Sequence, residues 1–214
     1  MVKAVFFDLW NTLLYCPTHG KVDEMLRQVG LGGKLDYGTI MEEMDNKLFT
    51  YPDYDIRKFL LELCEEKGVE CPRDAIESAA RMWESRLTQA EYFPETEAVL
   101  KDLHGNYKLG LISNTDRSGA DYVRKIRINQ YFDSMILSYE VGVVKPDPLM
   151  FKMALDDLDV RAQESWMVGD SVQADVEGAL NAGMNAVLII RDGITTAHTY
   201  PTIRSLTELR GIIK

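Results

Sequence analysis

The sequence lacks the features that would tie the protein to a membrane or to nucleic acid. It has no apolar run of membrane length, and its N-terminus shows neither a long apolar segment nor a small-residue cleavage site. It carries 24 Lys and Arg against 34 Asp and Glu, a formal net charge of −10. Because phosphate backbones are bound by clustered cations, we expect no nucleic-acid surface. Small solutes are therefore the expected partners.

Cysteine is also scarce. The three cysteines, Cys16, Cys64 and Cys71, are odd in number, and none lies at metal-ligand spacing from a histidine. We therefore expect reduced thiols in a reducing compartment, which predicts a cytoplasmic protein. With 46% apolar and 27% charged residues over 214 positions, the composition is that of a globular chain long enough to bury a core without disulfides.

One short apolar run near the beginning of the chain is followed by a long helical region. Residues 5–7 are typical of a buried strand, and this strand ends at Asp8. From about residue 21 to residue 88 the apolar residues recur at helical spacing. Helices are expected near residues 22–29, 36–49, 53–67 and 73–89. The short connections between them favour a compact helical bundle.

From residue 92 onward, short apolar strands alternate with helices, which indicates βαβ units and a parallel sheet. Strands are expected at residues 109–112, 134–137, 166–168 and 186–190, and helices at residues 95–103, 119–126, 148–158 and 172–182. We predict an α/β protein: a doubly wound parallel sheet formed by residues 1–15 and 92–214, with an all-helical domain of residues 16–91 inserted just after the first strand.

Polar side chains that could take part in catalysis or bind a ligand follow the predicted core strands at their carboxyl ends. These residues are Asp8, Ser113, Asn114, Lys145, Asp170 and Asp175. Because the carboxyl ends of parallel strands open on one edge of a sheet, we expect them to lie close together. Asp8 and Asp170, with Asp175 beside them, would offer the oxygen ligands that Mg²⁺ prefers. Ser113 could hold phosphate oxygens, and Lys145 could balance the charge of Asp8 and of a transferring group.

Several of these residues allow more than one interpretation. Asp8 could be a nucleophile, a metal ligand or an Asx turn that closes the strand. Asp175 falls inside a predicted helix, where it could be solvated, could ligate a metal or could support the ligands. Asn114 could orient the substrate or cap a turn. His19, just past the first strand, is a distant candidate for proton transfer.

Four stretches in this order resemble the haloacid dehalogenase superfamily of hydrolases. The first motif of that family, Asp-x-Asp-x-Thr at the end of a strand, stands here as residues 8–12, Asp-Leu-Trp-Asn-Thr. The Ser or Thr of the second motif matches Ser113, and the Lys of the third matches Lys145. The acidic pair of the fourth motif matches Asp170 and Asp175. The resemblance covers nearly the whole predicted core.

The resemblance implies a Rossmann-like core and phosphoryl transfer through an aspartyl-phosphate on Asp8. It implies Mg²⁺ as cofactor, bound by Asp8, Asp170 and the backbone carbonyl of Trp10, with Asp175 as a further ligand or as a neighbour of the ligands. Asn114 and Trp10 would contact the substrate. The helical insertion resembles the cap that closes over the site in this family, excluding water and selecting the substrate.

Trp10 is where the chain departs from the family. Phosphatases of the family have a second Asp here, which protonates the leaving oxygen and then activates water. Indole has one N–H that does not ionise usefully, so it can do neither. A positioned acid–base group is worth ~10²–10⁴ in rate, so alkyl phosphates should react slowly.

Three functions are compatible with Trp10. One is a Mg²⁺-dependent phosphohydrolase for good leaving groups such as aryl or acyl phosphates. Another is a 2-haloacid dehalogenase, since those relatives have an aromatic residue here and need no metal. The third is a catalytically silent metabolite-binding protein. At the fourth motif the dehalogenases have a sequence similar to Ser-Ser-Asn, whereas this chain has Gly-Asp-Ser at residues 169–171. An acidic residue there would repel a haloacid carboxylate, which favours the phosphohydrolase.

Overall fold

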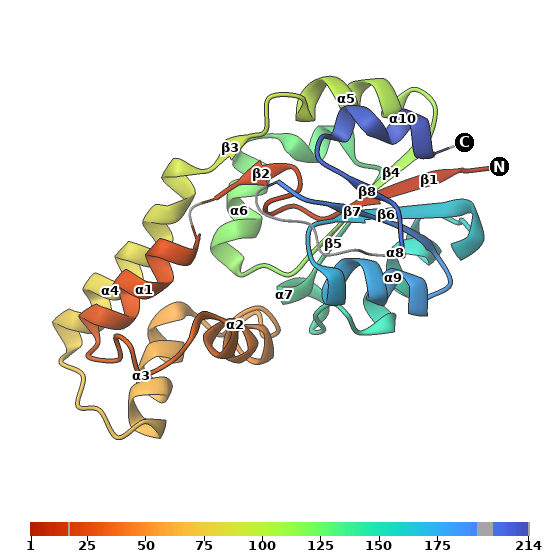
Figure 1. The fold of residues 1–214 in the computed structure, drawn as a ribbon. Helices are drawn as coiled ribbons and strands as arrows, with labels where there is room; N and C mark the ends of the chain where they lie inside the picture. The colour runs from red at the N-terminus through yellow and green to blue at the C-terminus, as the bar shows by residue number, and fades with distance from the viewer. Residues whose placement is uncertain (17, 192–198, 214) are drawn as a thin grey trace.

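The computed structural model describes residues 1–16, 18–191 and 199–213, with the backbone alone for residues 18 and 19. A six-stranded parallel sheet in the order β5-β4-β1-β6-β7-β8 forms its centre (Figure 1). The strands are β1 (Ala4–Phe7), β4 (Lys108–Ser113), β5 (Ser134–Leu137), β6 (Ser165–Gly169), β7 (Asn185–Ile189) and β8 (Thr202–Ile203). The predicted α/β fold with a doubly wound parallel sheet is confirmed.

Strand β1 lies in the middle of the sheet because every one of its residues is apolar. Val5 and Phe7 face one hydrophobic cluster, and Ala4 and Phe6 face the other, so the strand is buried on both sides. Gly110 of the neighbouring β4 makes room for this packing, because a Cβ there would lie 2.3 Å from Phe6 Cδ1. The residue that follows β1 therefore emerges at the centre of the sheet edge.

Helices cover both faces of the sheet (Figure 1). One face is covered by α5 (Thr96–His104), α6 (Arg117–Lys125) and α10 (Leu209–Ile212). The other is covered by α8 (Pro148–Asp157), the π-helical turn Val172–Glu177 and α9 (Gly178–Asn181). A short helix, α7 (Ser138–Val141), follows β5. The regular helix expected at 172–182 is thus split, and its first half is wound as a π-helix.

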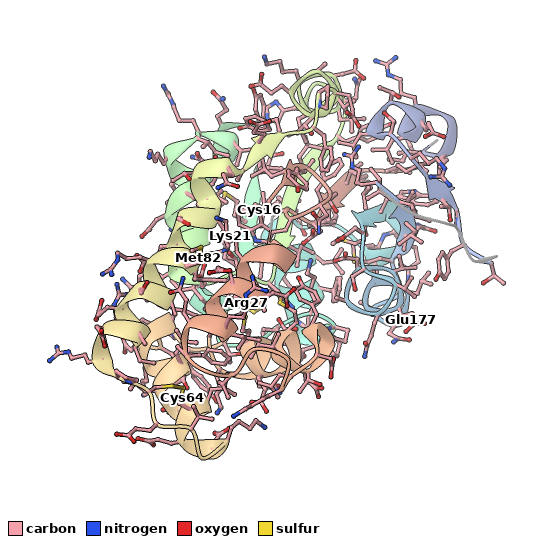
Figure 2. All side chains as sticks on the ribbon, turned by 60° about the vertical axis from the view of Figure 1, so that its left-hand side comes forward. Cys16, Lys21, Arg27, Cys64, Met82 and Glu177 are labelled. Atoms are coloured by element: carbon pink, nitrogen blue, oxygen red, sulfur yellow. A yellow bond between two sulfur atoms is a disulfide. The ribbon has the colours of Figure 1, made fainter. Side chains whose placement is uncertain are left out.

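Four helices lie between β1 and α5 in the sequence: α1 (Thr18–Gln28), α2 (Tyr37–Asn46), α3 (Ile56–Glu66) and α4 (Arg73–Ser85). They pack around a hydrophobic cluster of their own. Figure 2 shows α1 against α4, where Lys21 Nζ lies 3.7 Å from Met82 Sδ. Helices α2 and α3 begin later than expected because the Asp36 and Asp55 side chains accept hydrogen bonds from backbone N–H groups as N-caps. We call these four helices the helical insertion.

The chain leaves and re-enters the core through a pair of short antiparallel strands that the sequence did not indicate. Strand β2 (Leu14–Tyr15) pairs with β3 (Glu91–Tyr92). The proposed boundaries of the inserted domain, between residues 15 and 16 and between 91 and 92, fall at this pair. The division into two domains stays a proposal. No helix in the described part of the chain has both the length and the apolar character of a membrane span.

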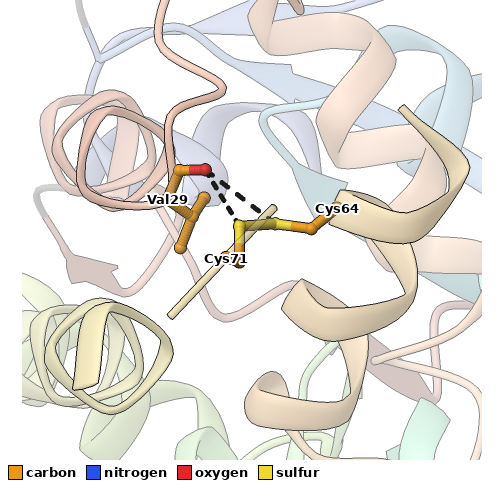
Figure 3. The surroundings of a disulfide bond; sticks show 3 residues. All are labelled: Val29, Cys64 and Cys71. Carbon is orange, nitrogen blue, oxygen red and sulfur yellow. Dashed lines mark hydrogen bonds between the residues drawn. A yellow bond between two sulfur atoms is a disulfide. The ribbon is translucent and has the colours of Figure 1, made fainter. Parts of the chain in front are cut away.

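Cys64 and Cys71 are joined by a disulfide bond, so the expectation of three reduced thiols was wrong (Figure 3). The turn between α3 and α4 brings their Cα atoms to 6.4 Å, and their sulfurs lie 3.9 and 3.0 Å from the Val29 carbonyl oxygen. The spacing of the cysteines did not reveal this pairing, because it depends on how the two helices turn back on each other. Cys16 is buried and not disulfide-bonded. The cysteines therefore no longer support a cytoplasmic location, which stays a prediction.

Candidate active site

Lys145 lies between two carboxylates at the carboxyl edge of the sheet. Its Nζ donates to Asp8 Oδ1 and Asp175 Oδ1, both at 2.7 Å, and to the Ile112 carbonyl oxygen at 2.8 Å. The side chains of Lys145, Asp8 and Asp175 are 2%, 9% and 2% exposed. The structure therefore brings together three of the predicted site residues as a buried ion-pair cluster.

Burial governs the charge states of this cluster. It raises the pKa of Asp8 to about 6, against the lowering effect of Lys145. Burial by itself would lower the pKa of Lys145, but the charges of Asp175 and Asp8 outweigh it and hold that pKa above its ordinary value. Lys145 is therefore a permanent cation beside the Asp8 carboxyl group.

Asp170 completes an acidic cluster with Asp8 and Asp175. One oxygen atom from each residue lies within 4.8 Å of the others. Burial, followed by the charges of Asp8 and Asp175, raises the pKa of Asp170 to about 8. A divalent cation would relieve this repulsion, and carboxylate oxygens are the ligands that Mg²⁺ prefers. The donor set therefore fits Mg²⁺.

The π-helical turn after β6 positions Asp175. Its Oδ2 accepts a hydrogen bond from Ser171 N at 3.0 Å, while Oδ1 faces Lys145. Gly169 permits this approach, because a Cβ there would lie 2.2 Å from Asp175 Cγ. Asp175 is 1% exposed, which excludes the interpretation as a solvated helix residue.

Asn114 connects the sheet edge to the helical insertion. Its side-chain oxygen accepts from Lys145 N at 2.7 Å, and its amide donates to the Lys145 carbonyl oxygen and to Asp45 Oδ1, both at 3.1 Å. Asp45 belongs to α2 and was not among the predicted site residues. Nothing in the sequence pattern separates it from a solvated acidic residue on an amphipathic helix. Ser113 is fully buried, and its Oγ has no hydrogen-bond partner in the described part of the structure.

A cavity of about 200 Å³ opens between the sheet edge and the helical insertion. The core contributes Asp8, Trp10, Asn11, Asn114, Thr115, Lys145, Asp170, Ser171, Ala174 and Asp175 to its lining. The insertion contributes Tyr37, Met41, Asp45, Phe49, Trp83 and Arg86. Ser113 is not among the described residues that line it. The side chain of His19 lies outside the described residues.

A buried ion pair forms a further contact between the insertion and the core. Asp116, which caps α6, accepts from Trp83 Nε1 at 2.7 Å and from Arg86 Nη2 at 3.1 Å. The Arg86 guanidinium lies 3.6 Å from the Trp83 ring centroid. Burial would raise the pKa of Asp116, but Arg86 and the hydrogen-bond donors outweigh it and lower that pKa. The sequence did not reveal this contact, since its residues come from segments about 30 positions apart.

Comparison with known proteins assigns the chain to one family. A model of the haloacid dehalogenase-like hydrolase family matches residues 2–183. The chain belongs to this family. The resemblance seen in the motifs is thereby confirmed, and with it the expectation of an enzyme of the hydrolase class.

Curated relatives in the haloacid dehalogenase family match most of the chain. A glyceraldehyde 3-phosphate phosphatase from Methanothermobacter thermautotrophicus is 32% identical over 199 residues, covering 88% of this chain and 86% of that protein. The human N-acylneuraminate-9-phosphatase is 29% identical, covering 100% and 94%. Among solved structures, a HAD phosphatase from Thermococcus onnurineus matches with a TM-score of 0.70 at 26% identity, covering 99% of this chain and 98% of that one.

Proposed function

We propose that this protein is a Mg²⁺-dependent phosphohydrolase that carries the phosphoryl group on Asp8. The observation that supports this most strongly is the buried pairing of Asp8 with Lys145, beside Asp170 and on the wall of a cavity. The curated relatives described above, which are phosphatases by name, support the same reaction class. The substrate would be a small phosphorylated molecule.

Each residue has a role that follows from its surroundings. The Asp8 carboxylate attacks phosphorus, and Lys145 offsets the negative charge that gathers as it does so. Asn114 holds the Lys145 backbone through two hydrogen bonds and so keeps that cation in place. The Ser113 hydroxyl, which has no hydrogen-bond partner among the described residues, would donate to a phosphate oxygen.

The acidic cluster would hold the metal ion. Its ligands would be Asp8, Asp170 and the backbone carbonyl of Trp10. Asp175 would be a further ligand, or it would support the site through its hydrogen bond with Lys145. Bound there, Mg²⁺ supplies positive charge to the phosphoryl oxygens. The helical insertion acts as a cap, because its residues form one wall of the cavity and shield the site from water.

Trp10 restricts the substrates. It lines the cavity at the position where family phosphatases have an acid, and indole cannot protonate a leaving oxygen. Phosphates whose leaving group departs without a proton, such as aryl and acyl phosphates, are therefore the preferred substrates. The acidic cluster argues against a 2-haloacid dehalogenase, because it would repel the carboxylate of a haloacid.

A metal-controlled turnover screen tests the proposal. Wild type and Asp8→Asn would be assayed with p-nitrophenyl phosphate, acetyl phosphate, an alkyl phosphate and 2-chloropropionate, each with Mg²⁺ and with chelator. We expect phosphate release that needs Mg²⁺ and is lost in Asp8→Asn, whose amide is nearly isosteric but a poor nucleophile. Chloride release without metal would establish the dehalogenase instead. No turnover of any substrate would support a binding protein.

A further inference from the structure

We propose that Asp45 of the helical insertion is the general base that activates water for hydrolysis of the phosphorylated Asp8. This inference rests on the proposed function and adds a catalytic residue to it. Trp10 leaves two tasks without a residue, protonation of the leaving group and activation of water. Good leaving groups remove the need for the first task, but the second is needed for every substrate.

The position of Asp45 follows from the geometry of phosphoryl transfer. The attacking and leaving oxygens lie roughly in line on opposite sides of phosphorus. With Asp8 at the sheet edge, the leaving group departs into the cavity, and the water that replaces it enters from there. Helix α2 places Asp45 on the wall of this cavity. The hydrogen bond from Asn114 Nδ2 to Asp45 Oδ1, 3.1 Å long, fixes the carboxylate relative to the segment that carries Lys145.

Other groups on the cavity wall are unsuited to the task. Of the described residues that line it, Asp45 is the one carboxylate outside the acidic cluster of Asp8, Asp170 and Asp175. Lys145 is a permanent cation. The remaining polar groups include an arginine, which does not give up its proton, and a tyrosine whose pKa burial raises. Among the described residues that line the cavity, Asp45 is therefore the carboxylate left to act as the base.

The surroundings of Asp45 tune it for this role. Burial raises its pKa to about 6, opposed by the hydrogen bond from Asn114 and the charge of Lys145, while Glu42 one turn away acts to raise it. At neutral pH such a carboxyl is mostly ionised, which is the state that a base needs, and it is basic enough to accept a proton from attacking water.

Hydrolysis forms one bond to phosphorus, breaks another and moves one proton. As the oxygen of water forms its bond to phosphorus, a proton of that water moves to Asp45. The bond between phosphorus and the Asp8 oxygen breaks, and its electron pair returns to the Asp8 carboxylate. Inorganic phosphate leaves, and protonated Asp45 releases its proton to solvent.

Asp45→Asn tests this step, because the amide oxygen can still accept from Asn114 while the side chain can no longer take a proton. The variant would be mixed rapidly with p-nitrophenyl phosphate at saturating Mg²⁺. We expect a burst of about one nitrophenolate per enzyme, followed by a steady-state rate lower by ~10²–10⁴. Acid quenching should show phosphoenzyme that accumulates. Glu65→Gln is the matched control, since Glu65 is exposed on helix α3 of the same insertion, does not line the cavity and is not among the groups that shift the pKa of Asp45; it should leave both phases unchanged.

Two results would overturn the role of Asp45. One is an unchanged steady-state rate in Asp45→Asn. The other is a lower rate without a burst, which would mean that Asp45 acts before hydrolysis, as a contact that positions the insertion. If Asp45→Asn does not melt cooperatively, Asp45→Ala is used with added formate, which should restore hydrolysis; no increase in rate would contradict the proposal. Failure of the proposed function looks different, since wild type would then form no Asp8-dependent phosphoenzyme at all.

Discussion

Lys145→Met should destabilise the protein strongly, because it removes the ammonium group that bonds both Asp8 and Asp175. Methionine fills a similar volume but carries no charge. The two carboxylate side chains are 9% and 2% exposed, so water cannot replace the lost partner. Removal of one partner from a buried ion pair typically costs ~3–5 kcal/mol. We expect the free energy of unfolding to fall by about that amount near pH 8.

The loss of stability in Lys145→Met should be larger at high pH than at low pH. In the wild type the folded-state pKa of Asp8 is already raised from 3.8 to about 6. Without Lys145 it rises further, because burial and the charge of Asp175 remain while the main lowering influence is gone. A carboxyl group whose pKa is higher in the folded than in the unfolded protein destabilises the fold only at pH values high enough to ionise it. The deficit of Lys145→Met should therefore be largest near pH 8, should shrink as the pH falls toward about 6 and should be smallest below that value.

Urea unfolding of both proteins at about pH 8 and about pH 5 measures this deficit. Lys152→Met is the matched control, since that side chain is 69% exposed and pairs with an exposed Asp156. Its effect should stay within about 0.5 kcal/mol. A deficit for Lys145→Met below about 1 kcal/mol near pH 8, or an equal deficit at both pH values, would refute the buried ion pair as the source of stability.

Further predictions concern the metal, the leaving group, the interface and the disulfide. Asp170→Asn should weaken Mg²⁺ binding in calorimetry and reduce the rise in melting temperature that Mg²⁺ gives; equal affinities would remove Asp170 from the metal site. Because Trp10 donates no proton to the leaving oxygen, single-turnover transfer should be far faster from p-nitrophenyl phosphate than from an alkyl phosphate, and equal rates would mean that another group does so. The pKa of Asp116 is lowered, so the stability that Asp116 contributes is complete above its ordinary pKa of 3.8 and is lost as the pH falls through the folded-state pKa. In Asp116→Asn the free energy of unfolding, measured with urea, should therefore fall less steeply at acid pH. An unchanged dependence on pH would contradict this role of Asp116. Reduction of the Cys64–Cys71 disulfide, which spans a separation of 7 residues, should cost roughly 2–3 kcal/mol, so a melting temperature unaffected by reductant would contradict a stabilising role.

The sequence predicted the centre of the fold well because local pattern and global structure agree there. The apolar run before Asp8 indicated a buried strand, which the structure has as β1, and residues 134–137 form β5 with the expected bounds. The edge rule for parallel sheets then brought Asp8, Lys145 and Asp170 together without coordinates. Strands β2, β3 and β8 have two residues each, too few to leave a periodic pattern.

The parts of the site that the sequence did not reveal depend on long-range packing. Asp45 reaches the cavity only because the insertion lies against the sheet edge, and 69 residues separate it from Asn114. Asp116 likewise meets Arg86 across that interface. The buried position of Asp175 depends on a π-helical turn, which helical periodicity does not distinguish from a regular helix.

Trapping the phosphoenzyme tests the central claim, that Asp8 carries the phosphoryl group, most directly. Wild type and Asp8→Asn would be mixed with acetyl phosphate and Mg²⁺, quenched in acid within one turnover, digested and analysed by mass spectrometry. We predict one phosphoryl group on the peptide that contains Asp8 in the wild type, and none in the variant. A wild type that releases phosphate while Asp8 is never phosphorylated, or an Asp8→Asn variant that keeps full turnover, would contradict the account.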